Sequence, residues 1–150
     1  MSNSFVSNRV HCVFATKGRV PLINSEIRSR LHAYLTATAK KIGIEPIAVG
    51  GTADHVHLLF ALPAKLALAE TMQKLKANSS KWVRVTFRLR TFAWQEGYSA
   101  FSVSIVATKA VEDYINGQED HHRKRDFRAE LEQMLRQHGV KVEDLPSYGL

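Results

Sequence analysis

The stretch Asp54-His55-Val56-His57-Leu58-Leu59-Phe60 decides the fold expected for this chain. It is a short apolar run that follows Gly50-Gly51 and ends before Pro63, and this pattern predicts a buried β-strand. Side chains alternate between the two faces of a strand, so His55 and His57 share one face, about 7 Å apart along it. Two imidazoles placed in this way can hold one metal ion. A lone His-x-His pair is more often a pair of hydrogen-bonded core histidines.

The segments on either side of this strand predict a β-α-β-β-α-β order followed by helices. Three further strands are expected at residues 8–16, 45–50 and 97–106. Helices are expected at residues 25–42, 66–79, 108–121 and 126–139. This order is typical of the ferredoxin-like α+β fold, which has an antiparallel sheet with two helices on one face. Residues 81–90 suit either a strand or a helix.

Capping residues and apolar alternation place these elements more closely. Asn24 or Ser25 can begin the first helix and Gly43 ends it. Thr108 is expected to cap the third helix, and Asp126 the last. Val10, Cys12 and Phe14 of the first strand should face the core, and Phe101, Val103 and Ile105 should share one face of the last strand.

Length and composition indicate one globular domain spanning residues 1–150, with a core at about 5–122 and a helical extension at 123–150. Hydrophobic residues make up 45% of the chain, and Cys12 is the single cysteine, so no disulfide framework exists. No apolar run approaches the roughly 18 residues of a membrane span, and no signal peptide is visible. We therefore expect a cytoplasmic protein.

The net charge of +7 is concentrated in one part of the chain. Residues 71–95 contain six basic residues and no acid, whereas residues 112–144 contain nine acids. A concentrated positive field favours a polyanion such as nucleic acid. The same pattern also suits a solvated helix face. The six basic residues are Lys74, Lys76, Lys81, Arg84, Arg88 and Arg90.

Tyr114 and Gln118 supply the second half of a candidate site. If residues 108–121 are helical, these two side chains lie one turn apart, and His121 lies on the same face. A phenolic oxygen can attack a phosphodiester when a cation polarises the phosphoryl oxygens. Two imidazoles and an amide oxygen can hold that cation, with His121 as an alternative third ligand. In isolation, a tyrosine and a glutamine on a helix are more often ordinary surface residues.

Together these motifs resemble the single-tyrosine HUH transposases of the IS200/IS605 type. The likeness rests on Asp54-His55-Val56-His57-Leu58-Leu59 and Tyr114-Ile115-Asn116-Gly117-Gln118, and it covers about residues 5–122. It extends to residues 16–19, 75–80 and 94–98. Residues 119–124 and the helix after them are similar to an extension found in some members, including the REP-associated tyrosine transposases.

The resemblance implies a metal-dependent transposase that cleaves and rejoins single-stranded DNA at hairpins near element ends. Tyr114 matches the nucleophile, which forms a 5′-phosphotyrosine link and frees a 3′-hydroxyl. His55, His57 and Gln118 match the ligands of Mg²⁺ or Mn²⁺. Family members are often homodimers, and in some of them the tyrosine helix of one subunit completes the site of the other. The residues expected to contact DNA are Lys17, Arg19, Lys74, Lys76, Ser79, Ser80, Lys81 and Arg84.

Two other functions are compatible with parts of the sequence. The first is a nucleic-acid-binding protein of the same fold that does not cut, such as a domesticated relative. A non-cutting protein has no chemical need for the histidine pair, the tyrosine and the glutamine together. The second is a small metalloenzyme unrelated to DNA, against which the acid-free basic stretch argues. Histidines are soft ligands for Mg²⁺, so their spacing alone also allows Zn²⁺.

Overall fold

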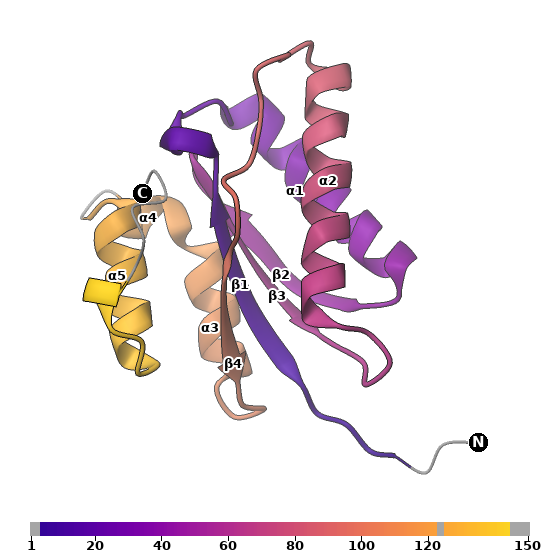
Figure 1. Ribbon diagram of the computed structural model, residues 1–150, viewed down its shortest axis with the longest axis vertical. Coiled ribbons are helices and arrows are strands. Elements are labelled where there is room, and N and C mark those ends of the chain that lie inside the picture. Colours follow the sequence, from indigo (N-terminus) through magenta and orange to yellow (C-terminus); the bar gives the residue numbers. More distant parts are fainter. Residues whose placement is uncertain (1–3, 123–124, 145–150) are drawn as a thin grey trace.

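The computed structural model describes residues 4–122 and 125–144 and has a four-stranded antiparallel sheet at its centre (Figure 1). The strands are β1 (Arg9–Ala15), β2 (Glu45–Gly51), β3 (His55–Ala61) and β4 (Ser99–Val103). Their order in the sheet is β2-β3-β1-β4, with every neighbouring pair antiparallel. The predicted ferredoxin-like α+β architecture is therefore confirmed. Residues 123–124 of the expected extension and the tail from 145 lie outside the described residues.

Helices cover both faces of the sheet and make three layers. On one face lie α1 (Ser25–Ile42) and α2 (Leu68–Thr86), as Figure 1 shows. The opposite face carries α3 (Thr108–Asn116) and α5 (Phe127–Gln137), with the short α4 (Gln118–His122) between them in the chain. Two 3₁₀ turns, Lys17–Arg19 and Val142–Asp144, complete the described elements. None of the described helices is long and apolar enough to cross a membrane.

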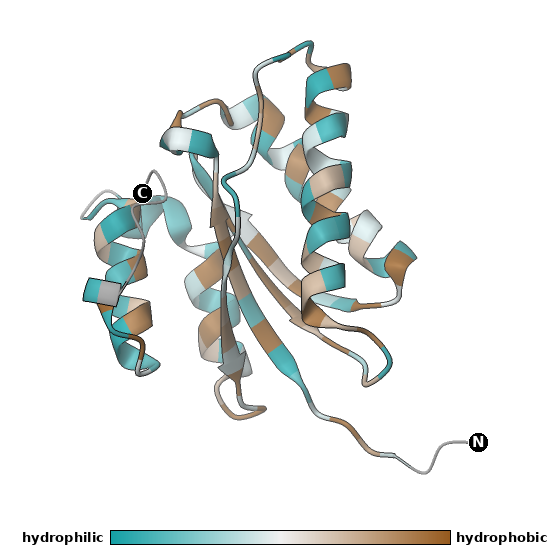
Figure 2. Ribbon diagram, viewed as in Figure 1, coloured by the Kyte–Doolittle hydropathy of each residue, from teal (hydrophilic) through white to brown (hydrophobic). Residues whose placement is uncertain are grey.

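The larger apolar core lies between the sheet and helices α1 and α2. Val10, Cys12 and Phe14 face this core from β1, as the alternation predicted. Hydrophobic residues line the strands and the inward faces of the helices in Figure 2. A smaller cluster joins the other face of the sheet to α5 and contains Val13, Ala15, Phe101, Phe127, Leu131, Met134 and Leu135. The β3 histidines belong to this second face.

Most element ends follow the predicted signals, but α2 is longer than expected. The side chain of Asn24 accepts from Ile27 N at the start of α1, and Gly43 ends that helix in the left-handed conformation at φ 94°. Helix α2 continues to Thr86 and does not end near Ser79. Ser79 is tolerated inside the helix because its hydroxyl accepts from Trp94 Nε1 at 2.9 Å. Part of the ambiguous segment 81–90 is thus helical.

Two expectations near β4 were wrong. Ile105 lies beyond the strand, which ends at Val103, and its side chain is 62% exposed. Thr108 does not cap α3: it is the first helical residue, and its hydroxyl donates to Ser104 O at 2.9 Å. The turn between strand and helix is therefore tighter than an extended strand to residue 106 would allow.

The helix that was expected to carry both Tyr114 and Gln118 is broken at Gly117. Helix α3 ends at Asn116, Gly117 follows with φ −99° and ψ 21°, and Gln118 begins α4. Glycine is costly in a helix interior, by up to about 1 kcal/mol relative to alanine, and favours such a break. Tyr114 and Gln118 therefore come from two successive helices.

Gly50 sets how closely α3 approaches the sheet. A Cβ atom at this position would lie 2.2 Å from Ile115 O and 2.8 Å from Ile115 Cγ2. Replacing Gly50 by alanine is expected to displace α3 and to lower the free energy of unfolding by about 1–3 kcal/mol, as overpacking does. Urea denaturation measures this loss. Gly117→Ala is the matched control, because its Cβ would meet nothing closer than Asp113 O at 3.4 Å. Equal midpoints for the two variants would contradict the steric argument.

Candidate metal centre

His55 and His57 project from β3 on the side of the sheet that faces α3 and α5. Both side chains are fully buried, with ring centroids 5.1 Å apart. Nε2 of His55 lies 2.9 Å from Gln118 Oε1, and Nε2 of His57 lies 3.0 Å from Glu130 Oε1. The prediction that the two rings share one face, close enough for a single ion, is confirmed.

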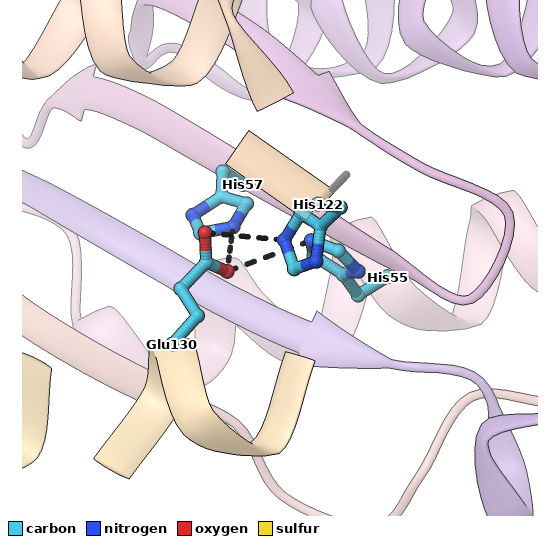
Figure 3. A group of neighbouring side chains, drawn as sticks. All are labelled: His55, His57, His122 and Glu130. Atoms are coloured by element: carbon cyan, nitrogen blue, oxygen red, sulfur yellow. Dashed lines mark hydrogen bonds and ion pairs between the residues drawn. The ribbon is translucent and has the colours of Figure 1, made fainter. Parts of the chain in front are cut away.

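His122 and Glu130 complete a cluster around the two strand histidines (Figure 3). One possible ligand atom from each of His55, His57, His122 and Glu130 lies within 4.8 Å of all the others. His122 Nε2 is 3.2 Å from Glu130 Oε2 and 3.1 Å from Gln118 Oε1. Helices α4 and α5 thus bring nitrogen and oxygen donors to the two imidazoles of β3.

The spacing of these donors fits a small divalent cation. An octahedral ion with ligands at about 2.1 Å holds neighbouring donors about 3 Å apart. The separations of 2.9, 3.0 and 3.1 Å at His55, His57 and His122 are hydrogen-bond lengths close to that edge length, whereas other donor atoms of the cluster lie up to 4.8 Å apart. Imidazole nitrogen together with amide and carboxylate oxygen is a donor set that can hold a divalent metal ion.

Each strand histidine is oriented by a partner at its other ring nitrogen. Nδ1 of His55 lies 2.8 Å from Asp54 Oδ1 and 3.2 Å from Thr52 Oγ1. Nδ1 of His57 lies 2.7 Å from Nε2 of His11, which reaches it from β1. Such partners fix the orientation and the protonated nitrogen of a metal-binding imidazole.

Tyr114 lies at the edge of this cluster. Its hydroxyl donates to Oε2 of Glu130, and Gln118 Nε2 donates to the same oxygen at 3.1 Å. The phenol ring stacks on His121, with centroids 4.5 Å apart and planes at 28°. His121, the predicted alternative ligand, therefore packs on Tyr114, and the neighbouring His122 is the one that joins the donors.

Burial and hydrogen bonding set the protonation of these groups. Burial lowers the pKa of His57 to about 4, although Glu130 partly opposes the effect, so this imidazole is neutral at pH 7. Burial alone would raise the pKa of Glu130, but its polar contacts with His122, His57 and Tyr114 outweigh burial and hold that pKa well below its usual range. Burial and the charge of Glu130 raise the pKa of Tyr114. In this arrangement the carboxylate is charged and the phenol keeps its proton.

The residues expected to bind DNA fall into two groups. Lys17, Lys74 and Lys81 are exposed, Lys17 in a 3₁₀ turn and the other two on α2. Arg19 and Ser80 are partly exposed in the same two elements. The remaining three are used inside the fold, as the contacts of Lys76, Ser79 and Arg84 show.

These three inner residues tie α2 to the segment that leads into β4. Lys76 Nζ donates to Gln95 O at 2.7 Å, and also to Gly97 O. Arg84 donates to Phe92 O at 3.2 Å. Ser79 is fully buried, so its predicted contact with DNA does not fit the structure. An open groove of about 440 Å³ remains beside them, lined partly by Gln73, Lys76, Ser80, Trp94, Gln95 and Tyr98.

Sequence reasoning missed three residues of the centre: His11, His122 and Glu130. His11 alternates with core residues of β1, so it had to lie on the face of His55 and His57. Glu130 falls within the apolar stripe of α5, between Phe127 and Leu131, and is fully buried. An acid inside an apolar stripe was the signal that pointed to it.

A ferredoxin-like sheet that carries a pair of strand histidines, a metal-type cluster and an adjacent tyrosine defines the HUH tyrosine class of transposases. The comparisons with known proteins agree with this class. The profile of the family "Transposase IS200 like" matches residues 4–118, and the chain belongs to this family. The match ends at Gln118, so His122 and Glu130 lie outside it.

Individual relatives span most of the chain. The transposase of insertion sequence element IS200 from Salmonella typhimurium is 28% identical over 117 residues, which are 73% of this chain and 76% of the relative. The ISDra2 transposase TnpA of Deinococcus radiodurans is 26% identical over 116 residues, 73% of this chain and 83% of the relative.

Two solved structures share the fold. One is a Deinococcus radiodurans transposase structure with a TM-score of 0.65 and 24% identity, covering 79% of this chain and 96% of its own. The other is a REP-associated tyrosine transposase bound to a REP hairpin, with a TM-score of 0.61 and 13% identity. That match covers 81% of this chain and 73% of the other.

Proposed function

We propose that this protein cleaves and rejoins single-stranded DNA, with Tyr114 as the nucleophile and a divalent ion at His55 and His57. One observation carries the proposal. The Tyr114 hydroxyl and Nε2 of His57 both contact the carboxylate of Glu130. The proposed nucleophile and a proposed metal ligand thus contact the two oxygens of one carboxylate group. Phosphoryl transfer needs a nucleophile and a Lewis acid this close together.

In the proposed reaction the Tyr114 oxygen forms a bond to phosphorus and the bond to the 3′-oxygen breaks. The products are a 5′-phosphotyrosine and a free 3′-hydroxyl: the phenol loses its proton as the new bond forms, and the departing 3′-oxygen takes up one proton. Attack by another 3′-hydroxyl on the phosphotyrosine reverses these changes and joins the strands. The covalent link preserves the energy of the phosphodiester, so rejoining needs no cofactor such as ATP.

We assign His55, His57 and Gln118 as the residues that would hold the ion, with His122 and Glu130 as the neighbouring donors. A bound Mg²⁺ or Mn²⁺ supplies positive charge that polarises the phosphoryl oxygens. His57 is neutral at pH 7, so the imidazole does not have to lose a proton before it binds a cation. Three nearby imidazoles favour Mn²⁺ over Mg²⁺.

Substrate access requires a change on the α5 side of the centre. His55, His57 and Glu130 are fully buried, and Tyr114 is half-buried. Glu130 lies between the histidines and the Tyr114 hydroxyl, where the scissile phosphate has to bind. We therefore expect the Glu130 side chain to leave this position when a DNA strand enters.

The DNA partner we propose is a strand with a hairpin, as the related REP-associated transposase binds a REP hairpin. The exposed basic residues of α2 and the groove beside Trp94 and Tyr98 form the surface that would bind this strand.

We also propose that the protein is a homodimer. Light scattering at working concentration tests it, and a monomer mass with full cleavage activity would rule it out.

The salt dependence of hairpin binding tests this surface. Lys74 and Lys81 are exposed on α2, and Lys74 is paired only with exposed Glu70 of the next turn, a weak interaction. Replacing both lysines by alanine should reduce the slope of log affinity against log salt by about 0.7 for each single-strand phosphate lost. Lys76 is left intact because it ties α2 to Gln95.

Lys41→Ala is the matched control for this measurement. Lys41 is exposed in the last turn of α1, away from the groove beside α2. Its removal lowers the net charge but should leave the slope unchanged. An unchanged slope for the Lys74 and Lys81 double variant would mean that these lysines are a solvated face only.

A covalent adduct is the direct test of the proposed function. The protein is incubated with a labelled single-stranded hairpin oligonucleotide and Mn²⁺ or Mg²⁺ and run on a denaturing gel. A protein–DNA band that needs the metal is expected. Tight hairpin binding without any such band would instead favour the non-cutting nucleic-acid-binding protein.

A further inference from the structure

His11 is the one described side chain that contacts the far nitrogen of His57. It projects from β1, is 5% exposed, and places Nε2 only 2.7 Å from His57 Nδ1. Strand register explains the contact: Val13 pairs with His57, and His11 lies one alternation further along the same face of β1.

The two rings are held firmly against one another. Their centroids lie 5.0 Å apart with planes at 29°, a stacked arrangement. On its other side His11 packs on Phe101 of β4 at 6.1 Å, and Phe101 in turn contacts His138 at 4.5 Å. β1 is a central strand, so His11 has β3 on one side and β4 on the other.

The position of the His57 proton decides whether this ring can bind a cation. A neutral imidazole carries one proton and binds a metal through its other nitrogen. Nε2 of His57 faces Glu130 and the donor cluster, and Nδ1 faces His11. Without an ion, Nε2 can carry the proton and donate it to Glu130. Binding a cation through Nε2 instead requires the proton on Nδ1, and a hydrogen-bond acceptor opposite Nδ1 favours that form.

The two strand histidines have different partners at Nδ1. His55 has the Asp54 carboxylate at Nδ1, an acceptor of full negative charge. His57 has a histidine in the same role. A neutral acceptor orients His57 without adding a second buried carboxylate beside Glu130, which would be costly.

We propose that His11 is a positioning residue for the metal centre: its Nε2 accepts the Nδ1 proton of His57 and keeps the Nε2 lone pair of His57 directed at the ion. The inference rests on the proposed function, because it concerns the same ion. It extends the centre to β1, a strand that carries none of the donors themselves.

The experiment compares Mn²⁺ affinity in the wild-type protein, His11→Leu and His11→Gln, by titration calorimetry of the full chain. Leucine fills the space but offers no acceptor, so the dissociation constant should rise about 10- to 100-fold, as for other partners of metal-binding histidines. Glutamine presents an amide oxygen near the former Nε2 and should restore most of the affinity. His32→Leu removes a half-buried histidine of α1 and should leave the affinity unchanged.

A second measurement detects the proton itself. In the wild-type protein with Mg²⁺, nitrogen NMR should show His57 protonated at Nδ1. Equal affinity of His11→Leu and wild type, an equal loss in His11→Gln and His11→Leu, or an Nε2-protonated His57 would each overturn the role of His11. These results would leave the proposed function standing if the metal-dependent DNA adduct still forms. A wild-type protein that binds no Mn²⁺ would overturn both.

Discussion

Replacing Tyr114 by phenylalanine is expected to abolish the covalent protein–DNA adduct, with hairpin affinity and metal binding retained. Removal of a covalent nucleophile costs on the order of 10⁶-fold in rate in well-studied enzymes, so no band should be detectable. The substitution deletes one oxygen and leaves the ring that stacks on His121 and lies 5.9 Å from the His57 ring. The measurement is the denaturing gel with labelled single-stranded DNA.

The fold should tolerate this change. Glu130 loses the hydroxyl of Tyr114 but keeps the hydrogen bond from Gln118 and its contacts with His57 and His122. The loss of one hydrogen bond to a charged group lowers the free energy of unfolding by about 1.5–3 kcal/mol. A folded variant that binds the hairpin and makes no adduct separates the chemical role of the hydroxyl from its structural role.

The other tyrosines provide the controls. Tyr34 stacks on Trp82 at 4.5 Å between α1 and α2, on the far side of the sheet from the metal centre. Tyr98 lines the groove beside α2 and packs against the larger core. Tyr98→Phe should still form the adduct, whereas Tyr148 lies outside the described residues. If Tyr98→Phe loses the adduct and Tyr114→Phe keeps it, the nucleophile has been misassigned.

The sequence was sufficient to predict the fold because its signals are local. Apolar alternation placed β1, an apolar run between breakers placed β3, and Gly43 marked the end of α1. It failed where a distant contact overrides a local preference. Ser79 looked like a helix breaker, but the indole of Trp94 donates to its hydroxyl and α2 continues past it.

From the sequence, the site was predictable only where the residues lie on one strand or one helix. The shared face of His55 and His57 follows from strand geometry alone. The contribution of Glu130 depends on how α5 docks against the sheet, and that docking is set by the apolar cluster that contains Phe127 and Leu131 of α5 and Phe101 of β4. No pattern within α5 says which strand it will cover, so an acid in its apolar stripe was visible but its partners were not.

Mn²⁺ is expected to raise the free energy of unfolding of the wild-type protein, and His57→Ala should remove the increase. A ligand that binds only the folded state at 100 times its dissociation constant adds about 2.7 kcal/mol. His57→Ala also removes one of the polar partners of Glu130 and the described hydrogen-bond partner of His11, which is destabilising in its own right. The measured quantity is therefore the difference between the free energies of unfolding with and without Mn²⁺ in each variant. The loss of stability caused by the substitution itself is present in both values and cancels.

The increase in the free energy of unfolding with Mn²⁺ also shows which residues of α4 bind the ion. Gln118→Ala and His122→Ala should each reduce the Mn²⁺ increment, because Gln118 Oε1 lies 2.9 Å from His55 Nε2 and 3.1 Å from His122 Nε2. His121→Ala is the matched control: it removes a neighbouring histidine whose ring packs on Tyr114, so the increment should stay at the wild-type value. An increment that survives in His57→Ala would place the ion elsewhere. One lost in His121→Ala but kept in His122→Ala would mean that α4 presents the other histidine to the metal.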